Sequence, residues 1–412
     1  MALHPLLGGA NAVHYEYHRT NGYDSMNDKQ SLPLRLGAVA EPKVAVIVLN
    51  WNGWLDTVEC LESLLRSDYE NFQIIVCDND SVDGSFQRLL EWADGSLTIN
   101  TTAEDAPDFW SYQPVPKPIN SVVYTLSTDT TEPECRPDTK LIFIQTGSNL
   151  GYAGGNNVGI RYAQAHSRAS YLWILNNDTV VDSQAMRWMV ECASRDHRIG
   201  NVGATLLQYG KPDTIQALAG GALLPMIGLD TQFGRGEKLA ATSDVLEPLE
   251  HVVGASMFVR IEAVRDVGLL DESYFLYREE TSWCIKFRKM NWKLSYSPKS
   301  IIWHKEGRST GFKSDLHDYY SVRNMLFLIK EYYPRSLPTT LLYWACIAVL
   351  PKLVRMQFHR VSSVGRAFRD FFRGIRGKSD AFTHSWPLLE AALRAEDEAV
   401  RRRARYHSRR LS

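Results

Sequence analysis

The sequence has almost no net charge, because its 46 lysine and arginine residues are balanced by 47 aspartate and glutamate residues. A chain whose whole surface binds nucleic acid carries a strong positive excess, so that class of function is excluded. Glycine and proline are also modest, at 27 and 17 of 412 residues, which excludes a fibrous or low-complexity chain. The whole sequence is 44% hydrophobic and 23% charged, which is typical of a folded protein with a sizeable core.

Cysteine is scarce and scattered. The sequence contains no CxxC pair, which argues against a zinc site and against a disulfide framework. A reducing compartment fits this cysteine usage best. The six cysteines are Cys60, Cys77, Cys135, Cys192, Cys284 and Cys346.

Long apolar runs are missing as well. No stretch reaches the ~18–20 apolar residues of a membrane-spanning helix, and residues 1–20 lack the basic start and apolar run of a secretory signal. The nearest approach is Leu341–Leu350, which is followed by Pro351 and is more typical of a buried or interfacial helix. We therefore expect a cytoplasmic protein that can attach peripherally to the inner face of the cell membrane.

Short buried strands alternate with helices from residue 43 onward. Unbroken β-branched runs are typical of strands that are covered on both faces, and their alternation with helices predicts an α/β fold with a mostly parallel sheet and right-handed crossovers. We predict strands at Val44–Leu49, Phe72–Cys77, Leu141–Gln145, Tyr171–Leu175, Val252–Val259 and Leu294–Ser297. We predict helices at Leu55–Arg66, Ser81–Trp92, Asn156–Ala165, Ala185–Ala193, Glu279–Lys289 and from Asp318 onward.

The chain divides into regions of different character. Residues 1–42 are expected to be a mobile leader, and residues 43–330 the α/β domain, in which residues 94–140 are an inserted loop or flap. Residues 331–412 are expected to be a helical, basic extension, because Lys352 to Ser412 hold 15 Lys/Arg against 6 Asp/Glu. A basic tail behind an apolar helix suits an anionic membrane surface; a solvated helical tail is an equally good interpretation.

Small polar residues follow four of the predicted strands. In open parallel sheets ligands bind beyond the carboxyl ends of the strands, so these exits predict a shared site. One such exit would be ordinary turn chemistry. The exits are Asn50-Trp51-Asn52-Gly53, Asp78-Asn79-Asp80-Ser81, Asn149-Leu150-Gly151 with Gly154-Gly155-Asn156, and Asn176-Asn177-Asp178.

Each exit has a plausible task and an ordinary alternative. Asp78 could accept hydrogen bonds from a base or ribose, or could instead cap the next helix. Gly151 and Gly155 would let the backbone approach a ligand, although the spacing is not GxGxxG. Asp178 on a tight turn could hold a hard divalent cation, but a lone aspartate in a turn is usually structural.

Longer segments identify a family. Six segments, taken in order, resemble the inverting glycosyltransferases of family two, especially the rhamnosyltransferase-like branch. They are VAVIVLNWNG, VCDNDSVDGS, NLGYAGGNN, LNNDTVVD, GASMFVRIEAVRDVGLLDESYFLYREETSWCIKFRKMNW and WHKEGRST. The resemblance covers about residues 43–330. It implies the GT-A fold, with a nucleoside-diphosphate sugar as donor and a saccharide or lipid-linked acceptor.

The resemblance also implies roles for individual residues. Glu280 would be the general base and Glu279 the second choice, while Asp178 and His304 would hold Mg²⁺ or Mn²⁺. His304 could instead contact the diphosphate. A metal would stabilise the leaving diphosphate, and a carboxylate would take the acceptor proton. The donor would contact the strand exits, for which we name Asn50, Asn52, Asp78, Asn79, Asn149, Gly151, Gly155, Asn156, Asn176 and Asn177.

Some observations weigh against this assignment. Glu279 and Glu280 open a helix, where the helix dipole favours carboxylates without any catalytic role. Asn176 replaces the first acid of the family's DxD motif, and Ser282 replaces a second Asp, which is expected to remove negative charge from the acceptor pocket.

The resemblance also implies a flexible loop near the donor, which is expected at Ser309–Thr310.

Two other functions compete with metal-dependent sugar transfer. A sugar nucleotidyltransferase would need a Gly-rich loop with a cation after the first strand, and the segment from Asn50 to Gly53 has none. A non-catalytic, donor-binding scaffold of an envelope polysaccharide assembly complex is the remaining alternative, because Asn176 and Ser282 depart from the motif. Donor hydrolysis by the purified protein would separate a scaffold from an enzyme.

Overall fold

The fold of the chain was analysed in a computed structural model, which describes residues 41–97, 114–125, 139–239, 248–306, 314–347 and 349–379. Nearly all of the expected leader, most of the 94–140 segment, Ser309–Thr310 and the Arg-rich C-terminal end lie outside these residues. Cys135 does too; the other five cysteines are free thiols, and all of these except Cys346 are buried.

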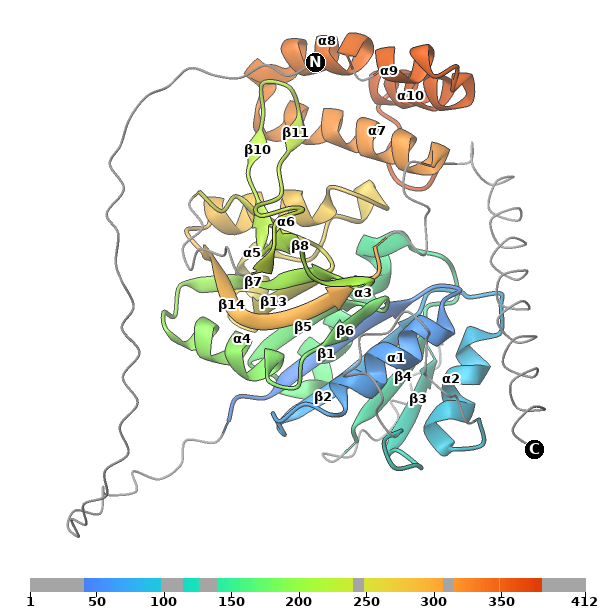
Figure 1. The fold of residues 1–412 in the computed structure, drawn as a ribbon, viewed down its shortest axis with the longest axis vertical. Coiled ribbons are helices and arrows are strands. Elements are labelled where there is room, and N and C mark those ends of the chain that lie inside the picture. Colours follow the sequence, from blue (N-terminus) through green and yellow to red (C-terminus); the bar gives the residue numbers. More distant parts are fainter. Residues whose placement is uncertain are drawn as a thin grey trace, which may run out of the picture. The chain divides into compact units, whose positions relative to one another are not determined.

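A large mixed sheet forms the centre of the domain (Figure 1). Its order is β3-β4-β2-β1-β5-β13-β7-β14-β6, with β8 paired to β7. The five strands from β3 to β5 are parallel, whereas β13 is antiparallel to both of its neighbours. The predicted α/β fold with a mostly parallel sheet is thereby confirmed. The strands are β1 Val44–Asn50, β2 Phe72–Asp78, β3 Ser121–Thr125, β4 Leu141–Gln145, β5 Tyr171–Asn176, β6 Thr179–Val181, β7 Ile199–Gln208, β8 Lys211–Leu218, β13 Ser256–Arg260 and β14 Lys293–His304.

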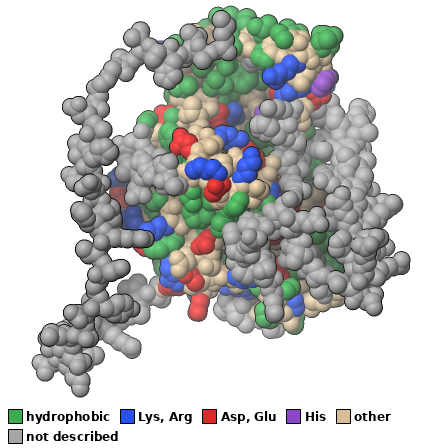
Figure 2. All heavy atoms as spheres, in the orientation of Figure 1, with side chains coloured by type: hydrophobic (Ala, Val, Ile, Leu, Met, Phe, Trp, Pro, Cys, Tyr) green, Lys and Arg blue, Asp and Glu red, His purple; other side chains and the backbone are tan. Residues whose placement is uncertain are grey.

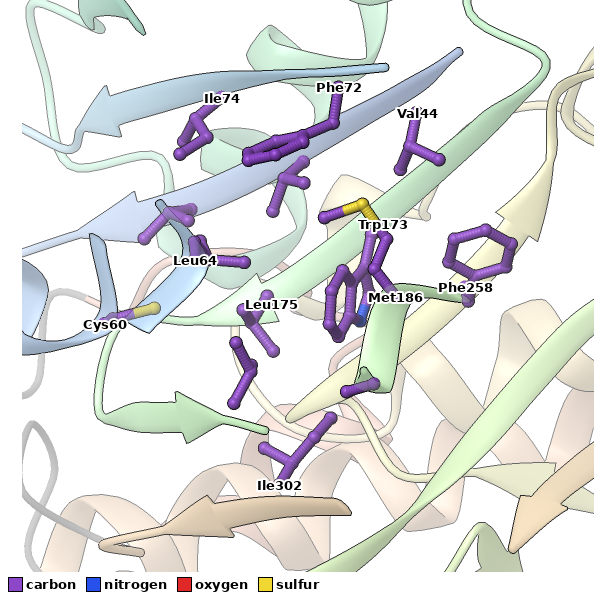
Figure 3. Packing of buried hydrophobic residues seen from close by; sticks show 14 of the residues in the cluster. Val44, Cys60, Leu64, Phe72, Ile74, Trp173, Leu175, Met186, Phe258 and Ile302 are labelled. Carbon is purple, nitrogen blue, oxygen red and sulfur yellow. The ribbon is translucent and has the colours of Figure 1, made fainter. Parts of the chain in front are cut away.

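Helices cover both faces of this sheet, as parallel strands require. Apolar side chains that alternate along β1 enter two separate cores: Val44 and Val46 pack on one face, and Ala45 and Ile47 on the other. Figure 3 shows the first core, where Trp173 lies near Phe258. The helices of the domain are α1 Trp54–Leu64, α2 Ser85–Asp94, α3 Gly151–Tyr162, α4 Ala185–Ser194, α5 Ile261–Val267 and α6 Glu279–Lys289, with a π-helical turn at Ala163–Ser167 and a 3₁₀ turn at Glu272–Tyr274.

Three predicted elements differ from the structure. The strand expected over 252–259 is two strands, β12 His251–Val252 and β13, because Val253–Ala255 turn between them at the site. The glycine-rich turn expected before residue 156 is already helical, since α3 begins at Gly151. The segment 94–140, expected to be a loop, contains the edge strand β3, which pairs with β4.

Small hairpins extend the second half of the domain. Strand β9 Gly220–Gly221 pairs with β12, and β10 Leu223–Leu224 pairs with β11 Leu229–Asp230. The β10–β11 hairpin reaches the C-terminal helices (Figure 1), where Thr340 Oγ1 donates to the Pro225 carbonyl at 2.9 Å and Trp344 Nε1 donates to the Gly228 carbonyl at 3.2 Å.

Helices follow β14 to the end of the described chain, as expected for the extension. They are α7 Asp315–Tyr332, a 3₁₀ turn at Pro334–Ser336, α8 Leu337–Leu342, a π-helical turn at Tyr343–Ile347, α9 Leu350–Val354 and α10 Phe358–Phe372. Among the described residues, the helical run Pro334–Val354, 21 residues long, is apolar enough to cross a membrane by length and composition. This finding corrects the expectation that no stretch is long enough to do so.

Candidate active site

One cavity of about 620 Å³ lies where the parallel strands end, and β13, β14 and α6 complete its walls. Because the strand exits meet there, the predicted convergence of loops is found in the structure. Predicted site residues that line the cavity are Asn79, Asn149, Gly151, Asn176, Asn177, Asp178, Glu279, Glu280 and His304. Predicted site residues that do not line it are Asn50, Asn52, Asp78, Gly155 and Asn156.

A buried polar network joins the first two strand exits. Asn50 is fully buried, and its Nδ2 donates to Asp78 Oδ1 at 2.7 Å. The second carboxylate oxygen of Asp78 accepts from the Ser81 backbone N–H at 3.1 Å. Burial raises the pKa of Asp78 from its ordinary value, against the opposing effect of its hydrogen bonds to Ser81 and Asn50. Asn50 therefore orients Asp78.

The neighbouring exit loop, from Asn52, belongs to the same network. Asn52 Oδ1 accepts from the Val82 backbone N–H at 2.8 Å, which ties the loop after β1 to the loop after β2. Its Nδ2 is buried and has no partner among the described residues. Asn52 is thus the residue of this network that retains an unused donor.

The glycine-rich segment serves packing more than ligand approach. A Cβ atom at Gly155 would lie 2.4 Å from Leu49 Cδ1, so Gly155 allows α3 to lie against β1. At Gly151 a Cβ would lie 2.2 Å from the Phe275 carbonyl oxygen. Asn79 Nδ2 donates to the Gly151 carbonyl at 3.2 Å, and Asn156 Nδ2 donates to the Tyr152 carbonyl at 2.9 Å. These contacts explain the small and amide residues without a ligand.

The turn after β5 places one carboxylate in the cavity. Asp178 Oδ1 lies 3.1 Å from His304 Nε2, and His304 Nδ1 lies 3.0 Å from Gln216 Oε1. Burial opposes ionisation of both groups, but the His304 charge and hydrogen bond lower the pKa of Asp178, and Asp178 in turn raises the pKa of His304. The neighbouring Asn177 supports the turn, because its Nδ2 donates to Thr57 Oγ1 at 3.0 Å.

A largely buried lysine, Lys305, connects the same turn to helix α1. The Lys305 N–H donates to the Asp178 carbonyl at 3.0 Å, and the Lys305 ammonium pairs with Asp56 and Glu59 of α1. These two carboxylates raise the pKa of Lys305 although its burial acts in the opposite direction. Because the Lys305 ammonium is paired with these two carboxylates, Lys305 anchors the turn after β5 to α1.

Asp178 and His304 could serve as two protein ligands of a metal ion, with its other ligands coming from elsewhere. Both side chains are over nine-tenths buried and both line the cavity. In the part of the chain that the structure describes, no group of three or more His, Cys, Asp or Glu could hold a metal ion. Mg²⁺ sites commonly use one or two protein ligands, with substrate phosphates and water supplying the rest, so this pair fits a divalent cation that arrives with a diphosphate.

The acid pair lies on another wall, at the start of α6. Burial raises the pKa of Glu279 well above its ordinary value, the Glu280 charge adds to this effect, and Glu279 Oε2 has no partner among the described residues. Burial also raises the pKa of Glu280, which the Arg278 charge opposes. Ser282 lies elsewhere: it is fully buried and shares a 3.0 Å hydrogen bond with Tyr332. The expected loss of charge from the acceptor pocket at Ser282 is therefore wrong.

The loop before α6 has a costly backbone conformation. Phe275, Tyr277 and Arg278 have positive φ angles of 64°, 67° and 79°, at roughly 1–3 kcal/mol each for non-glycine residues. Buried Asn324 of α7 holds this loop, because its Nδ2 donates to the carbonyls of Tyr274, Leu276 and Tyr277 at 2.8, 2.8 and 3.0 Å. Helix α7 thus fixes the place where the acid pair begins.

Three residues that the sequence motifs did not single out also line the cavity, namely Tyr152, Asp230 and Arg278. Arg278 forms a 2.7 Å ion pair with Asp230 of the β10–β11 hairpin. Tyr152 donates to the Gly254 carbonyl at 2.6 Å. Burial raises the pKa of Tyr152 well above its ordinary value, and the charges of Glu279, Glu280 and Asp178 add to this. Tyr152 therefore lies within electrostatic reach of both acidic groups.

Comparison with known proteins agrees with this arrangement. A model of the glycosyl transferase family 2 domain matches residues 45–102, which run from β1 past α2. This part of the chain is similar to the glycosyl transferase family 2 domain. The hexosyltransferase Agl10 of low-salt glycan biosynthesis in Haloferax volcanii is 24% identical over 242 residues, which are 58% of this chain and 76% of that protein.

Two further proteins resemble parts of this glycosyltransferase. The N-acetylglucosaminyl-diphospho-decaprenol L-rhamnosyltransferase of Mycobacterium tuberculosis is 26% identical over 193 residues, which are 42% of this chain and 61% of that protein. The solved structure of GalNAc-T7 with UDP, GalNAc and Mn²⁺ has a TM-score of 0.51 at 14% identity, and covers 82% of this chain and 57% of that one. The latter similarity concerns the fold alone. Because these relatives are glycosyltransferases, we prefer this assignment to the nucleotidyltransferase and scaffold alternatives.

Proposed function

We propose that this glycosyltransferase moves a hexose or deoxyhexose, with rhamnose as one candidate, from a nucleoside-diphosphate donor to a hydroxyl group of a polysaccharide or lipid-linked saccharide. The transfer inverts the anomeric carbon and is assisted by Mg²⁺ or Mn²⁺. One observation carries the proposal: the Asp178–His304 pair and the Glu279–Glu280 pair line the same cavity of about 620 Å³. Displacement of a diphosphate by a hydroxyl group needs these two kinds of group on either side of one carbon.

Glu280 is the base in this proposal. It removes the proton from the acceptor hydroxyl as that oxygen attacks the anomeric carbon, and the bond to the diphosphate breaks with its electron pair. Burial raises the pKa of Glu280, which makes its carboxylate a stronger base at neutral pH. One base and one displacement give inversion.

The donor would lie along the exits of β1, β2, β4 and β5. Asn79 and Asn149, which line the cavity at these exits, are the residues we assign to the nucleoside. Asp78, which is oriented by Asn50 at 2.7 Å, lies behind the cavity wall and would support these loops. Asp178 and His304 would hold the divalent cation, which supplies charge stabilisation for the leaving diphosphate. The solved neighbour that contains UDP and Mn²⁺ supports this pairing of nucleotide and metal.

The acceptor would enter from the side of α6 and α7. Tyr277, His317 and Ser321 line the cavity there. The name of the mycobacterial relative gives a rhamnosyl group and a decaprenol-linked acceptor, which supports a saccharide on a lipid carrier as the acceptor class. With such an acceptor, the proposed place of action is the inner face of the cell membrane.

The test is a thermal-shift and turnover screen of the purified full chain with UDP-, dTDP- and GDP-sugars, with and without Mn²⁺. A ligand at one hundred times its Kd stabilises the folded state by about 2.7 kcal/mol, so the true donor should raise the Tm. The Mn²⁺-dependent part of that rise should disappear in His304→Ala and persist in His197→Ala, a histidine on the surface. A screen in which no sugar nucleotide shifts the Tm or is turned over would refute the proposal.

A further inference from the structure

The helices after α7 carry an uncovered apolar surface, here called the C-terminal face. Of the fourteen large hydrophobic residues that are exposed in the described part of the chain, nine lie between residues 342 and 375. Hydrophobic side chains gather over these helices at the top of Figure 2. The C-terminal face consists of Leu342, Ile347, Leu350, Leu353, Val354, Met356, Phe358, Phe372 and Ile375. Contiguous apolar patches of this kind mark interaction sites.

The same segment is strongly basic. Residues 334–379 contain nine Lys/Arg and one acid, Asp370, a local charge of 9 − 1 = +8. Part of this charge is neutralised within the protein, because Asp370 pairs with Arg369 at 2.8 Å. Acids of α7 pair with three more of the basic residues, namely Lys352, Arg360 and Arg376. Arg355 and Arg373 are exposed beside the apolar residues. The face therefore combines an apolar surface with a positive field.

We propose that the C-terminal face lies on an anionic lipid surface. Apolar side chains and a basic cluster are the two signals that together give stable peripheral attachment to a membrane. A second copy of the chain is the other occupant to consider, but a symmetric pairing would bring two surfaces of the same charge together. Anionic headgroups instead complement that charge.

The contacts of the helical run favour attachment along the surface over insertion across it. Thr340 is fully buried and is bonded to the Pro225 carbonyl, and Trp344 is bonded to the Gly228 carbonyl. A spanning helix would have to break these bonds, and Pro351 interrupts the run near its end. One side of the run is bonded to the β10–β11 hairpin and the other side is exposed. This arrangement is that of an interfacial helix, which lies along a membrane surface.

The helices that carry the C-terminal face also pack next to the cavity. Leu276 and Tyr277, which line the cavity, belong to the same apolar cluster as Leu337, Leu341 and Trp344 of the C-terminal helices. A lipid surface on this face would bring a lipid-linked saccharide to the acceptor side of the cavity. The attachment itself does not depend on which acceptor is used, so it can be tested without activity.

The test is flotation of the full chain with vesicles of phosphatidylcholine alone or with added phosphatidylglycerol. The protein should float only with the anionic vesicles and should be released at high salt, because salt screens the headgroup attraction. The triple variant V354S/M356S/F358S changes side chains that are 75%, 73% and 59% exposed, and should reduce the bound fraction at least tenfold. R355Q/R373Q should also weaken binding to the anionic vesicles.

The matched control is V82S/V123S/M290S, which changes exposed apolar residues on other elements and should leave flotation unchanged. Circular dichroism would show that each variant is folded. The proposal is overturned if the wild-type chain does not float, if it resists extraction by alkaline carbonate as a spanning protein does, or if sedimentation shows a dimer that V354S/M356S/F358S dissociates.

Discussion

Replacement of Asn324 tests whether α7 positions the acid pair. Asn324→Ala removes an amide that donates to three carbonyls, at 2.8, 2.8 and 3.0 Å; the first of these hydrogen bonds is buried and the other two are partly buried. The Tyr274 carbonyl also accepts from the Leu276 N–H at 2.8 Å and from Arg323 Nη2 at 3.4 Å, so two carbonyls, those of Leu276 and Tyr277, are counted as orphaned. Each orphaned carbonyl costs about 1–3 kcal/mol, which predicts a loss of about 2–6 kcal/mol in the free energy of unfolding.

The effect on catalysis should exceed the effect on folding. Without Asn324 the residues with positive φ, Phe275, Tyr277 and Arg278, can relax, and this relaxation would shift the start of α6. A misplacement of about 1 Å can cost about a hundredfold in rate, so we expect kcat to fall about 10- to 100-fold. The KM for the donor should change little, because the donor loops lie on other elements.

The assay combines urea unfolding with steady-state kinetics on the folded fraction. Gln73→Ala is the matched control, since buried Gln73 Nε2 donates to the Thr139 carbonyl at 2.8 Å near the start of β2, away from the strand exits. It should lose stability without a fall in kcat. Asn324→Ser, which retains one donor, covers the case that the alanine variant does not fold. If kcat of the Asn324 variants matched that of Gln73→Ala, α7 would not position the acids.

Other predictions concern the acid pair. Glu280→Gln should lower kcat by about 10²- to 10⁴-fold and leave the donor-induced rise in Tm intact, whereas Glu262→Gln on the surface should change neither; a fully active E280Q would reject the base. Arg278→Met should raise the pKa of Glu280 and move the acid limb of the pH–rate profile to higher pH, while Asp230→Asn should lower that pKa and move the limb to lower pH; shifts in one direction would contradict this. Because burial raises the pKa of Glu279 above its unfolded value, its ionisation destabilises the fold as pH rises through the raised pKa. Glu279→Gln should therefore gain stability in urea titrations at pH 8 but not at pH 4, and an equal effect at both values would refute the argument.

The central sheet could be predicted because its signal is local. Runs such as Val44–Leu49 are apolar without alternation, which only a strand covered on both faces requires. The convergence of the strand exits followed from the topology of parallel sheets. Glu279, Glu280 and His304 came instead from the family resemblance, and the structure brings them to the same cavity.

Long-range partners were not predictable in the same way. The pairing of Arg278 with Asp230 joins residues on separate elements, and Asp230 lies in a two-residue strand without a periodic pattern. Residue type also misled at Ser282, whose hydroxyl faces Tyr332, because the direction of a side chain on a helix depends on how the helix docks. The glycines at 151 and 155 indicated ligand approach, yet their neighbours are Phe275 and Leu49.

The contact between Gly151 and Phe275 has a consequence for protein engineering. The Tyr152 N–H donates to the Phe275 carbonyl at 2.7 Å, and no Cβ fits at Gly151. The proposed nucleotide side and the proposed saccharide side are therefore joined by a contact between backbone atoms, which exchange of surface side chains cannot adjust. A chimera that takes its acceptor half from another transferase must bring the start of α3 and the loop at Phe275 from the same parent, or the two halves will not close on each other.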